Sequence, residues 1–265
     1  MDNQGGNRIK GWQTRGWSAF ADHDGIRSRA CRPEPDSRKT SPAVTIEAEV
    51  ADRNRIAVGS KATMIPIIRD YRPADLAEIY EICLLVGDNG KDATPLYRER
   101  NILGDLYAGA YGRLAPELAF VAEDRDGVCG FTLGVLDTAA FEDRLEREWW
   151  PALRQRYRDP SDIPAGKRTA DERAASLIHH PPRAPSDLLA AYPSHLHIDV
   201  LPRQQGQGLG GRLMQSILDA LRQAGSPGVH LVVSAGNPHA IGFYHHQGFR
   251  LLSGGPTALT LGRRL

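Results

Sequence analysis

Hydrophobic positions recur at regular spacing from about residue 64 to the end of the chain, but not before it. Residues 1–63 are dominated by Gly, Ser, Arg and Asp and show no periodicity. A stretch of this kind cannot bury enough apolar surface to offset the entropy cost of ordering it. We therefore predict a disordered extension over 1–63 and one folded domain over 64–265.

The first part of this domain predicts short strands and helices. Apolar residues in the segment that begins at Pro73 follow helical spacing, and proline is favoured at a first helical position. Gly130 and Gly134 lie within a hydrophobic strand, which indicates a bulge or a close backbone approach. The predicted elements are a strand at 65–68, a helix from Pro73, a helix at 95–107 and a hairpin of 118–122 with 128–136.

Residues 137–192 have the pattern of a helical insertion. An apolar stripe at helical spacing runs through the first half, and Pro181, Pro182 and Pro185 interrupt the second half. We interpret this stripe as packing rather than as ligand contacts. Its members are Phe141, Leu145, Trp149, Leu153 and Tyr157.

The last third predicts a strand, a glycine-rich turn and an amphipathic helix. The strand covers 194–201, and Gly225 suits the left-handed residue that ends such a helix. The core face of the helix consists of Leu209, Leu213, Ile217 and Leu221. The remaining elements are a strand at 229–233, a helix from the N-cap Asn237 to Gly248, and strands at 251–252 and 258–261.

Composition narrows the class of protein. Lys plus Arg (33) nearly equals Asp plus Glu (32), so no global charge favours nucleic acid or an anionic membrane. The three cysteines are widely spaced, which fits neither a disulfide framework nor a metal site. The N-terminus lacks a signal-peptide pattern, and no apolar run approaches the ~20 residues needed to cross a bilayer. We expect a cytoplasmic protein without metal, nucleic acid or membrane.

A strand followed by a glycine-rich turn and a helix is a phosphate-binding arrangement, since backbone N–H groups converge at the positive end of the helix. Gly206-x-Gly208-x-x-Gly211 formally fits a dinucleotide motif, but the acidic residue expected after the next strand is missing at 232–235. A nucleotide-hydrolysing P-loop is excluded because no Lys-Ser or Lys-Thr follows the glycines.

A third interpretation uses the loop together with residues downstream. Gln205-x-x-Gly208-x-Gly210 resembles motif A of the GNAT superfamily of acyl-CoA-dependent N-acyltransferases, and 237–249 resembles its motif B. The resemblance extends from about Met64 to the C-terminus. The insertion and the segments 87–94 and 192–200 are similar to one subgroup, the bacterial relatives of the acetyltransferase-like C-terminal domain of O-GlcNAc hydrolase.

This resemblance implies an α/β fold and a donor site for acetyl-CoA. The sheet would be mixed and mostly antiparallel, with about six to seven strands, helices on both faces, and a splay between 194–201 and 229–234. Backbone groups near Ile198 and Val200 would bind the pantetheine arm, and the loop amides would bind the pyrophosphate. The donor-binding residues implied are Ile198, Val200, Gln205, Gly206, Gln207, Gly208, Leu209, Gly210, Asn237 and Tyr244.

The resemblance also implies direct attack of an amine acceptor on the thioester, with Tyr244 as the general acid. The general base departs from the family pattern, because Ser194 and Leu196 occupy the usual positions and neither is a base. His195, His197 and Asp199 alternate onto the other strand face, where a structural histidine is the commoner case. Asp199 and Asp92 remain as base candidates.

The leading hypothesis is therefore an acetyl-CoA-dependent N-acetyltransferase acting on a small-molecule or protein amine. Two alternatives stay open: a non-catalytic module that keeps the fold, and an enzyme that uses a different acyl donor. The complete glycine loop favours real donor binding. The sequence does not identify the acceptor, and exposed strand edges make a homodimer conceivable.

Overall fold

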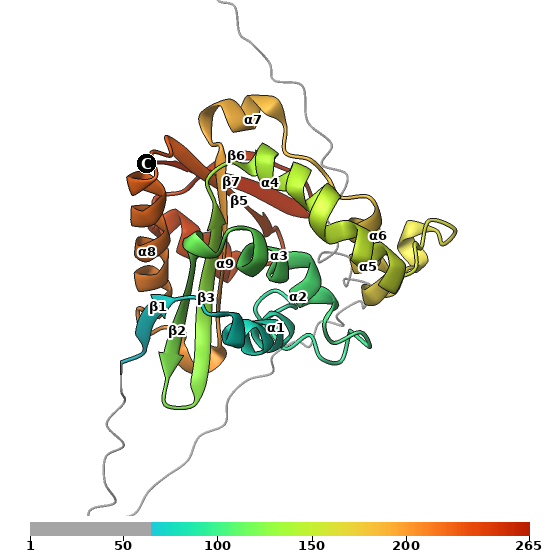
Figure 1. The fold of residues 1–265 in the computed structure, drawn as a ribbon, viewed down its shortest axis with the longest axis horizontal. Helices are drawn as coiled ribbons and strands as arrows, with labels where there is room; N and C mark the ends of the chain where they lie inside the picture. Colours follow the sequence, from blue (N-terminus) through green and yellow to red (C-terminus); the bar gives the residue numbers. More distant parts are fainter. Residues whose placement is uncertain (1–64) are drawn as a thin grey trace, which may run out of the picture.

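The computed structural model describes residues 65–265 (Figure 1). The prediction for residues 1–63 lies outside the described residues. Within the described range, a central sheet is covered by helices on both faces, and a group of further helices extends from one side.

The sheet has seven strands in the order β1-β2-β3-β4-β5-β7-β6. Every neighbouring pair is antiparallel except β4 and β5, which are parallel. This confirms the predicted mixed, mostly antiparallel sheet. The strands are β1 Ile67–Asp70, β2 Ala119–Asp124, β3 Gly127–Val135, β4 Ser194–Val200, β5 Gly228–Ser234, β6 Arg250–Gly254 and β7 Ala258–Arg264.

Helices α1 to α3 lie on one face of the sheet and α8 lies on the other (Figure 1). A π-helical segment at Leu145–Trp149 joins α4 to α5, and a short 3-10 turn at Pro202–Gln204 follows β4. The helices are α1 Leu76–Leu85, α2 Ile102–Tyr107, α3 Gly109–Leu114, α4 Thr138–Arg144, α5 Trp150–Arg156, α6 Ala170–His179, α7 Ser186–Ala191, α8 Leu209–Gln223 and α9 Pro238–His246.

The two glycines of β3 allow α8 to pack closely on the sheet. A Cβ atom at Gly130 would lie 3.3 Å from the Leu213 side chain, and one at Gly134 would lie 2.8 Å from that of Ile217. Side chains there would push the helix away. The close-approach interpretation of these glycines is therefore correct, and the predicted core face of α8 is fully buried.

The predicted helix at 95–107 is wrong in its first half, because only Ile102–Tyr107 is helical. The Asp171 carboxylate, at the start of α6, accepts the backbone N–H groups of Arg98 and Glu99, both at 3.1 Å. This contact from far along the chain holds the segment in turns. The first strand lies at 67–70 rather than 65–68, since pairing with β2 sets its ends.

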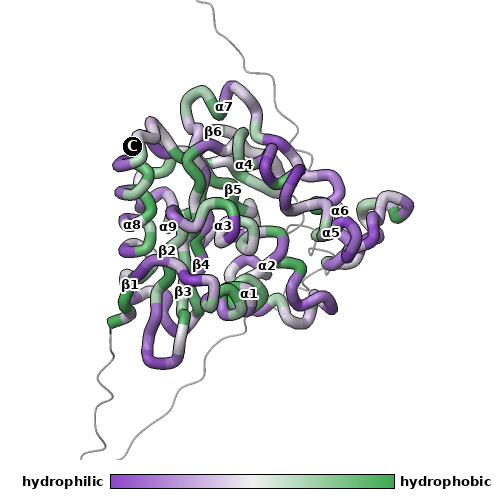
Figure 2. The backbone as a smooth tube through the Cα atoms, in the orientation of Figure 1, coloured by the Kyte–Doolittle hydropathy of each residue, from purple (hydrophilic) through white to green (hydrophobic). Residues whose placement is uncertain are grey.

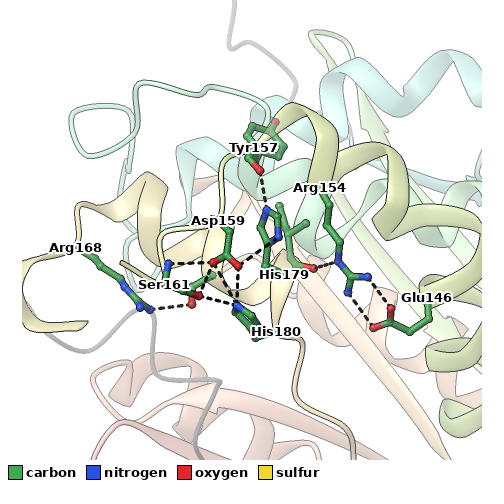
Figure 3. A network of polar contacts seen from close by, with 10 residues as sticks. Glu146, Arg154, Tyr157, Asp159, Ser161, Arg168, His179 and His180 are labelled. Carbon is green, nitrogen blue, oxygen red and sulfur yellow. Dashed lines mark hydrogen bonds and ion pairs between the residues drawn. The ribbon is translucent and has the colours of Figure 1, made fainter. Parts of the chain in front are cut away.

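Helices α4 to α7 occupy the segment 137–192; α6 packs against α5 and α2, whereas α7 lies apart from them at the top of Figure 1. Figure 3 shows the polar contacts that join these helices. Arg154 binds the Glu146 carboxylate at 2.8 and 3.1 Å and also donates to the carbonyl of Ile178. Figure 2 shows mostly hydrophobic residues along the central strands and many hydrophilic residues along α5 and α6.

Candidate functional site

The sheet opens between β4 and β5. These strands pair only at Ser194 with Val229 and at His195 with His230. Beyond these two pairs the strands diverge, so residues 196–200 face no partner strand on that side. The predicted splay between the two segments is thereby confirmed.

Backbone groups of β4 point into this opening. The Leu201 N–H donates to the Cys129 carbonyl of the antiparallel neighbour β3 at 2.9 Å. Because hydrogen-bonded and non-hydrogen-bonded pairs alternate along an antiparallel ladder, the groups of Ile198 and Val200 face away from β3. The Gln205 side chain donates to the Val200 carbonyl at 2.8 Å and so links the opening to the next loop.

The glycine loop follows β4 and borders open space. Gly206 and Gly208 have φ values of 72° and 80°, which glycine adopts without strain. Within the described chain, no atom would lie within 4 Å of a Cβ placed at either position. In α8 the Arg212 N–H donates to the Gly208 carbonyl at 3.2 Å, and the amides of 209–211 are the unsatisfied ones of a helix start.

An acidic residue on the hairpin anchors this loop. The Asp124 carboxylate accepts hydrogen bonds from Arg203 at 3.1 Å and from the Gln204 side chain at 2.8 Å. Burial on its own would raise the pKa of Asp124, but the Arg203 hydrogen bond and its neighbours lower the pKa to about 2. The carboxylate is therefore ionised at neutral pH and fixes the 3-10 turn from which the loop departs.

Two titratable candidates come from elements near the opening, Asp199 from β4 and Tyr244 from α9, the latter buried in the apolar cluster that includes Leu196 and Leu231. Asp199 is half-buried. Burial raises the pKa of Asp199 to about 7. Burial also raises the pKa of Tyr244, and the negative charge of Asp199 raises it further.

His195 is held as a neutral imidazole. The Thr138 hydroxyl donates to the Pro193 carbonyl at 2.6 Å, so its oxygen can only accept from His195 Nδ1, at 2.8 Å. Nε2 then accepts a hydrogen bond from the Tyr111 hydroxyl at 2.7 Å. Burial lowers the pKa of His195 well below its usual range. With both nitrogens engaged, His195 is a structural residue.

The other predicted residues are placed differently. Asp92 is exposed, and its carboxylate accepts the Thr94 N–H at 2.8 Å, in a turn that lowers its pKa. Asn237 caps α9, since its side-chain oxygen accepts the Ala240 N–H at 3.0 Å. His197 is half-buried beside the opening, and burial lowers its pKa to about 4. The Asp92 carboxylate thus stabilises a local turn, which leaves Asp199 and Tyr244 as the titratable candidates near the opening.

A cavity of about 650 Å³ lies where the opening begins. Its floor is formed by residues 195–197 of β4 and 230–232 of β5, and its walls come from α2, α3 and the helices of 137–192. Sequence analysis did not predict this cavity. The apolar stripe was a partial signal, because Phe141 and Leu145 line the cavity as well as pack.

Comparison with known families decides the classification. The Acetyltransferase (GNAT) family profile matches residues 94–249, which is more than half of the chain. The chain belongs to the GNAT acetyltransferase family. Acetyl-CoA is the acyl donor that this membership indicates.

Solved structures and curated proteins agree with the GNAT assignment. A crystal structure of SsHAT is 37% identical, with a TM-score of 0.71, and the match covers 76% of this chain and 98% of that one. PH1933 from Pyrococcus horikoshii OT3 is 16% identical with a TM-score of 0.50 over 76% of this chain and 98% of that one, and shows the fold alone.

Protein O-GlcNAcase from Rattus norvegicus is 28% identical over 183 residues, which is 68% of this GNAT chain and 20% of the rat protein. The chain therefore spans about a fifth of the length of this curated relative. Among residues 65–265, no helix is both long and apolar enough to cross a membrane. The same residues contain no cluster of His, Cys, Asp and Glu suited to a metal ion.

Proposed function

We propose that this protein is an acetyl-CoA-dependent N-acetyltransferase that transfers the acetyl group directly to an amine. The observation that carries the proposal is the opening between β4 and β5, which has free amides at one end and both Asp199 and Tyr244 beside it. An acyl donor and a nucleophile need to meet at such a place, with a proton acceptor and a proton donor nearby.

The donor would lie along β4 with its pyrophosphate at the start of α8. The amides of Gly206 to Gly210 and the helix N-terminus offer hydrogen bonds and partial positive charge to phosphate oxygens, whereas the Gln205 N–H already donates to the Pro202 carbonyl at 3.3 Å. The backbone groups of Ile198 and Val200 face the opening, where they can bond the amides of a pantetheine arm. Asn237 would contribute to donor binding indirectly, by fixing the start of α9. Its side-chain oxygen already accepts the Ala240 N–H of that helix.

Asp199 is the residue we assign as general base. A pKa of about 7 leaves a large fraction ionised at neutral pH while making the carboxylate far more basic than an exposed one. As the amine nitrogen bonds to the acetyl carbon and the carbon–sulfur bond breaks, Asp199 takes a proton from the nitrogen. The departing thiolate takes a proton from the Tyr244 hydroxyl, whose raised pKa keeps it protonated until then.

Calorimetric titration of CoA tests the donor half of the proposal. Gly208→Val places a β-branched residue at a φ of 80° and should weaken CoA binding by at least ~2 kcal/mol, the scale of one or two lost charge-assisted hydrogen bonds. Gly166→Val is the matched control, since it adds the same side chain in open space away from the loop. Equal CoA affinity in the two folded variants would refute the donor site.

A further inference from the structure

The residues that line the cavity beside β4 indicate which chemical class of acceptor it can bind. This inference rests on the proposed function, because it takes the cavity as the place from which the acceptor reaches the thioester. The cavity floor includes Leu196, His197, Leu231 and Val232, which are the first residues of the opening. A molecule in the cavity would therefore end where the acetyl group is expected.

Tyr111 presents only a hydrogen-bond acceptor to this cavity. Its hydroxyl proton is committed to His195 Nε2, since the contact between Thr138 and His195 places the imidazole proton on Nδ1. The phenol oxygen keeps a lone pair, and no described residue donates to it. A group that donates an N–H can satisfy this oxygen, whereas a carbonyl or carboxylate cannot.

The charged groups that line the cavity also favour an amine over an anion. Glu142, Glu146 and Asp187 line it, and among the described lining residues Arg183 is the single Arg or Lys. The Arg183 guanidinium already pairs with Asp143 and with Glu142, the latter at 3.3 Å.

The three lining histidines add no positive charge. Burial lowers the pKa values of His195, His197 and His230, so these side chains are neutral at physiological pH. Within the described residues, no unpaired cation is left in the cavity for a carboxylate or phosphate of the acceptor. An anionic acceptor would be desolvated there without compensation.

The rest of the lining is largely apolar. Phe141, Leu145, Trp150 and Leu188 supply hydrophobic surface, and the cavity volume of about 650 Å³ is in the range of sites for small organic molecules. A cavity of this volume accommodates a compact ligand better than an extended polypeptide.

We propose that the acceptor is a small primary amine on an apolar body that carries no anionic group, and that Tyr111 selects it by accepting its N–H. Tyr111 is thus a specificity-determining residue, and Glu142 disfavours anions at the same end of the cavity. The nitrogen lies at the floor of the cavity beside His195, and the apolar body lies toward α4 and α7. Asp199 lies four residues further along β4 and does not line the cavity, so the proton of the nitrogen reaches it through intervening water.

A matched pair of probes tests the charge requirement on the wild-type protein. Phenethylamine and phenylalanine have the same body and differ by one carboxylate. With acetyl-CoA as donor, we expect kcat/KM to be at least about 100-fold higher for phenethylamine, because the carboxylate would be buried without a partner. Phenylalanine turned over within tenfold of phenethylamine would overturn the inference, as would a lysine peptide turned over when phenethylamine is not.

Tyr111→Phe tests the hydrogen bond, with Tyr71→Phe as the control because Tyr71 lies against α3 outside the cavity lining. We expect KM for phenethylamine to rise about tenfold in Tyr111→Phe, the scale of one lost hydrogen bond, with little change in kcat or in CoA affinity. A purely structural role would instead lower the melting temperature and leave KM unchanged, which would overturn the assignment.

Failure of the inference is distinguishable from failure of the proposed function. If the protein binds acetyl-CoA but acetylates no amine, the proposed function fails. Calorimetric titration of phenethylamine into the complex with CoA then decides the inference by itself. Binding that weakens about tenfold in Tyr111→Phe supports it, and absence of binding overturns it.

Discussion

Replacing Asp199 with asparagine tests the site without knowledge of the acceptor. The carboxyl has a pKa of about 7 in place of 3.8, because the folded protein desolvates it. Its folded-state pKa lies above the unfolded value, so the folded state binds the proton more tightly. The wild-type protein therefore loses stability as pH rises from about 4 to about 7, and Asp199→Asn does not.

The size of the effect follows from the pKa. At about 1.4 kcal/mol for each pKa unit, ionising this carboxyl costs roughly 4 kcal/mol more in the folded protein than in the unfolded chain. Asp199 keeps some solvent access, so water in the opening reduces that cost, and we expect about 1 to 2 kcal/mol. Asp199→Asn should therefore melt about 3 to 6 °C above wild type at pH 8, and close to wild type at about pH 3, below the pKa of this carboxyl in the unfolded chain.

Thermal melts of both proteins over this pH range provide the assay, and Asp92→Asn provides the control. The pKa of Asp92 is lowered by its bonds to Thr94, so removing that charge should give no stabilisation at pH 8. The reasoning is refuted if Asp199→Asn differs from wild type equally at both pH values, or is the less stable protein at pH 8. If Asp199→Asn melts at a higher temperature and also loses acetyl transfer, the result would support Asp199 as a general base whose burial destabilises the folded protein.

Three further variants test other parts of the structure. Tyr244→Phe should lower the rate of acetyl transfer about 100-fold with donor affinity and melting temperature nearly unchanged, and a silent variant would make Tyr244 a packing residue. Asp124→Ala should weaken CoA binding about tenfold by releasing Arg203 and Gln204. Asp126→Ala removes an exposed carboxylate from the same turn and is the control. It should leave the CoA affinity measured by calorimetry unchanged. Gly134→Val should lower the free energy of unfolding by at least about 2 kcal/mol in denaturant titrations, since it collides with α8. A normal Gly134→Val stability would contradict the observed packing.

Local patterns were sufficient for much of the fold. Helix α8 was predictable because Leu209, Leu213, Ile217 and Leu221 repeat at helical spacing and meet a single buried surface. The splay was expected from a resemblance rather than from the spacing of residues, and the two-residue pairing of β4 with β5 confirms it.

What the sequence did not predict depends on residues far apart in the chain. The turns at 95–101 are held by Asp171, and the cavity combines Tyr111, Glu142 and His195 from three separate segments. The pKa of Asp199 likewise depends on what surrounds it, which alternation along β4 does not reveal. Motifs in the sequence were sufficient to name candidates such as Tyr244, whereas the direction of their pKa shifts depends on the folded surroundings.

Amine-dependent release of CoA from acetyl-CoA tests the central claim most directly. The wild-type protein should release free thiol in proportion to added amine, with the acetylated amine detected by mass spectrometry, and Asp199→Asn should lose this release at neutral pH. Tight binding of acetyl-CoA without amine-dependent release across a broad amine panel would contradict the claim and indicate a non-catalytic module.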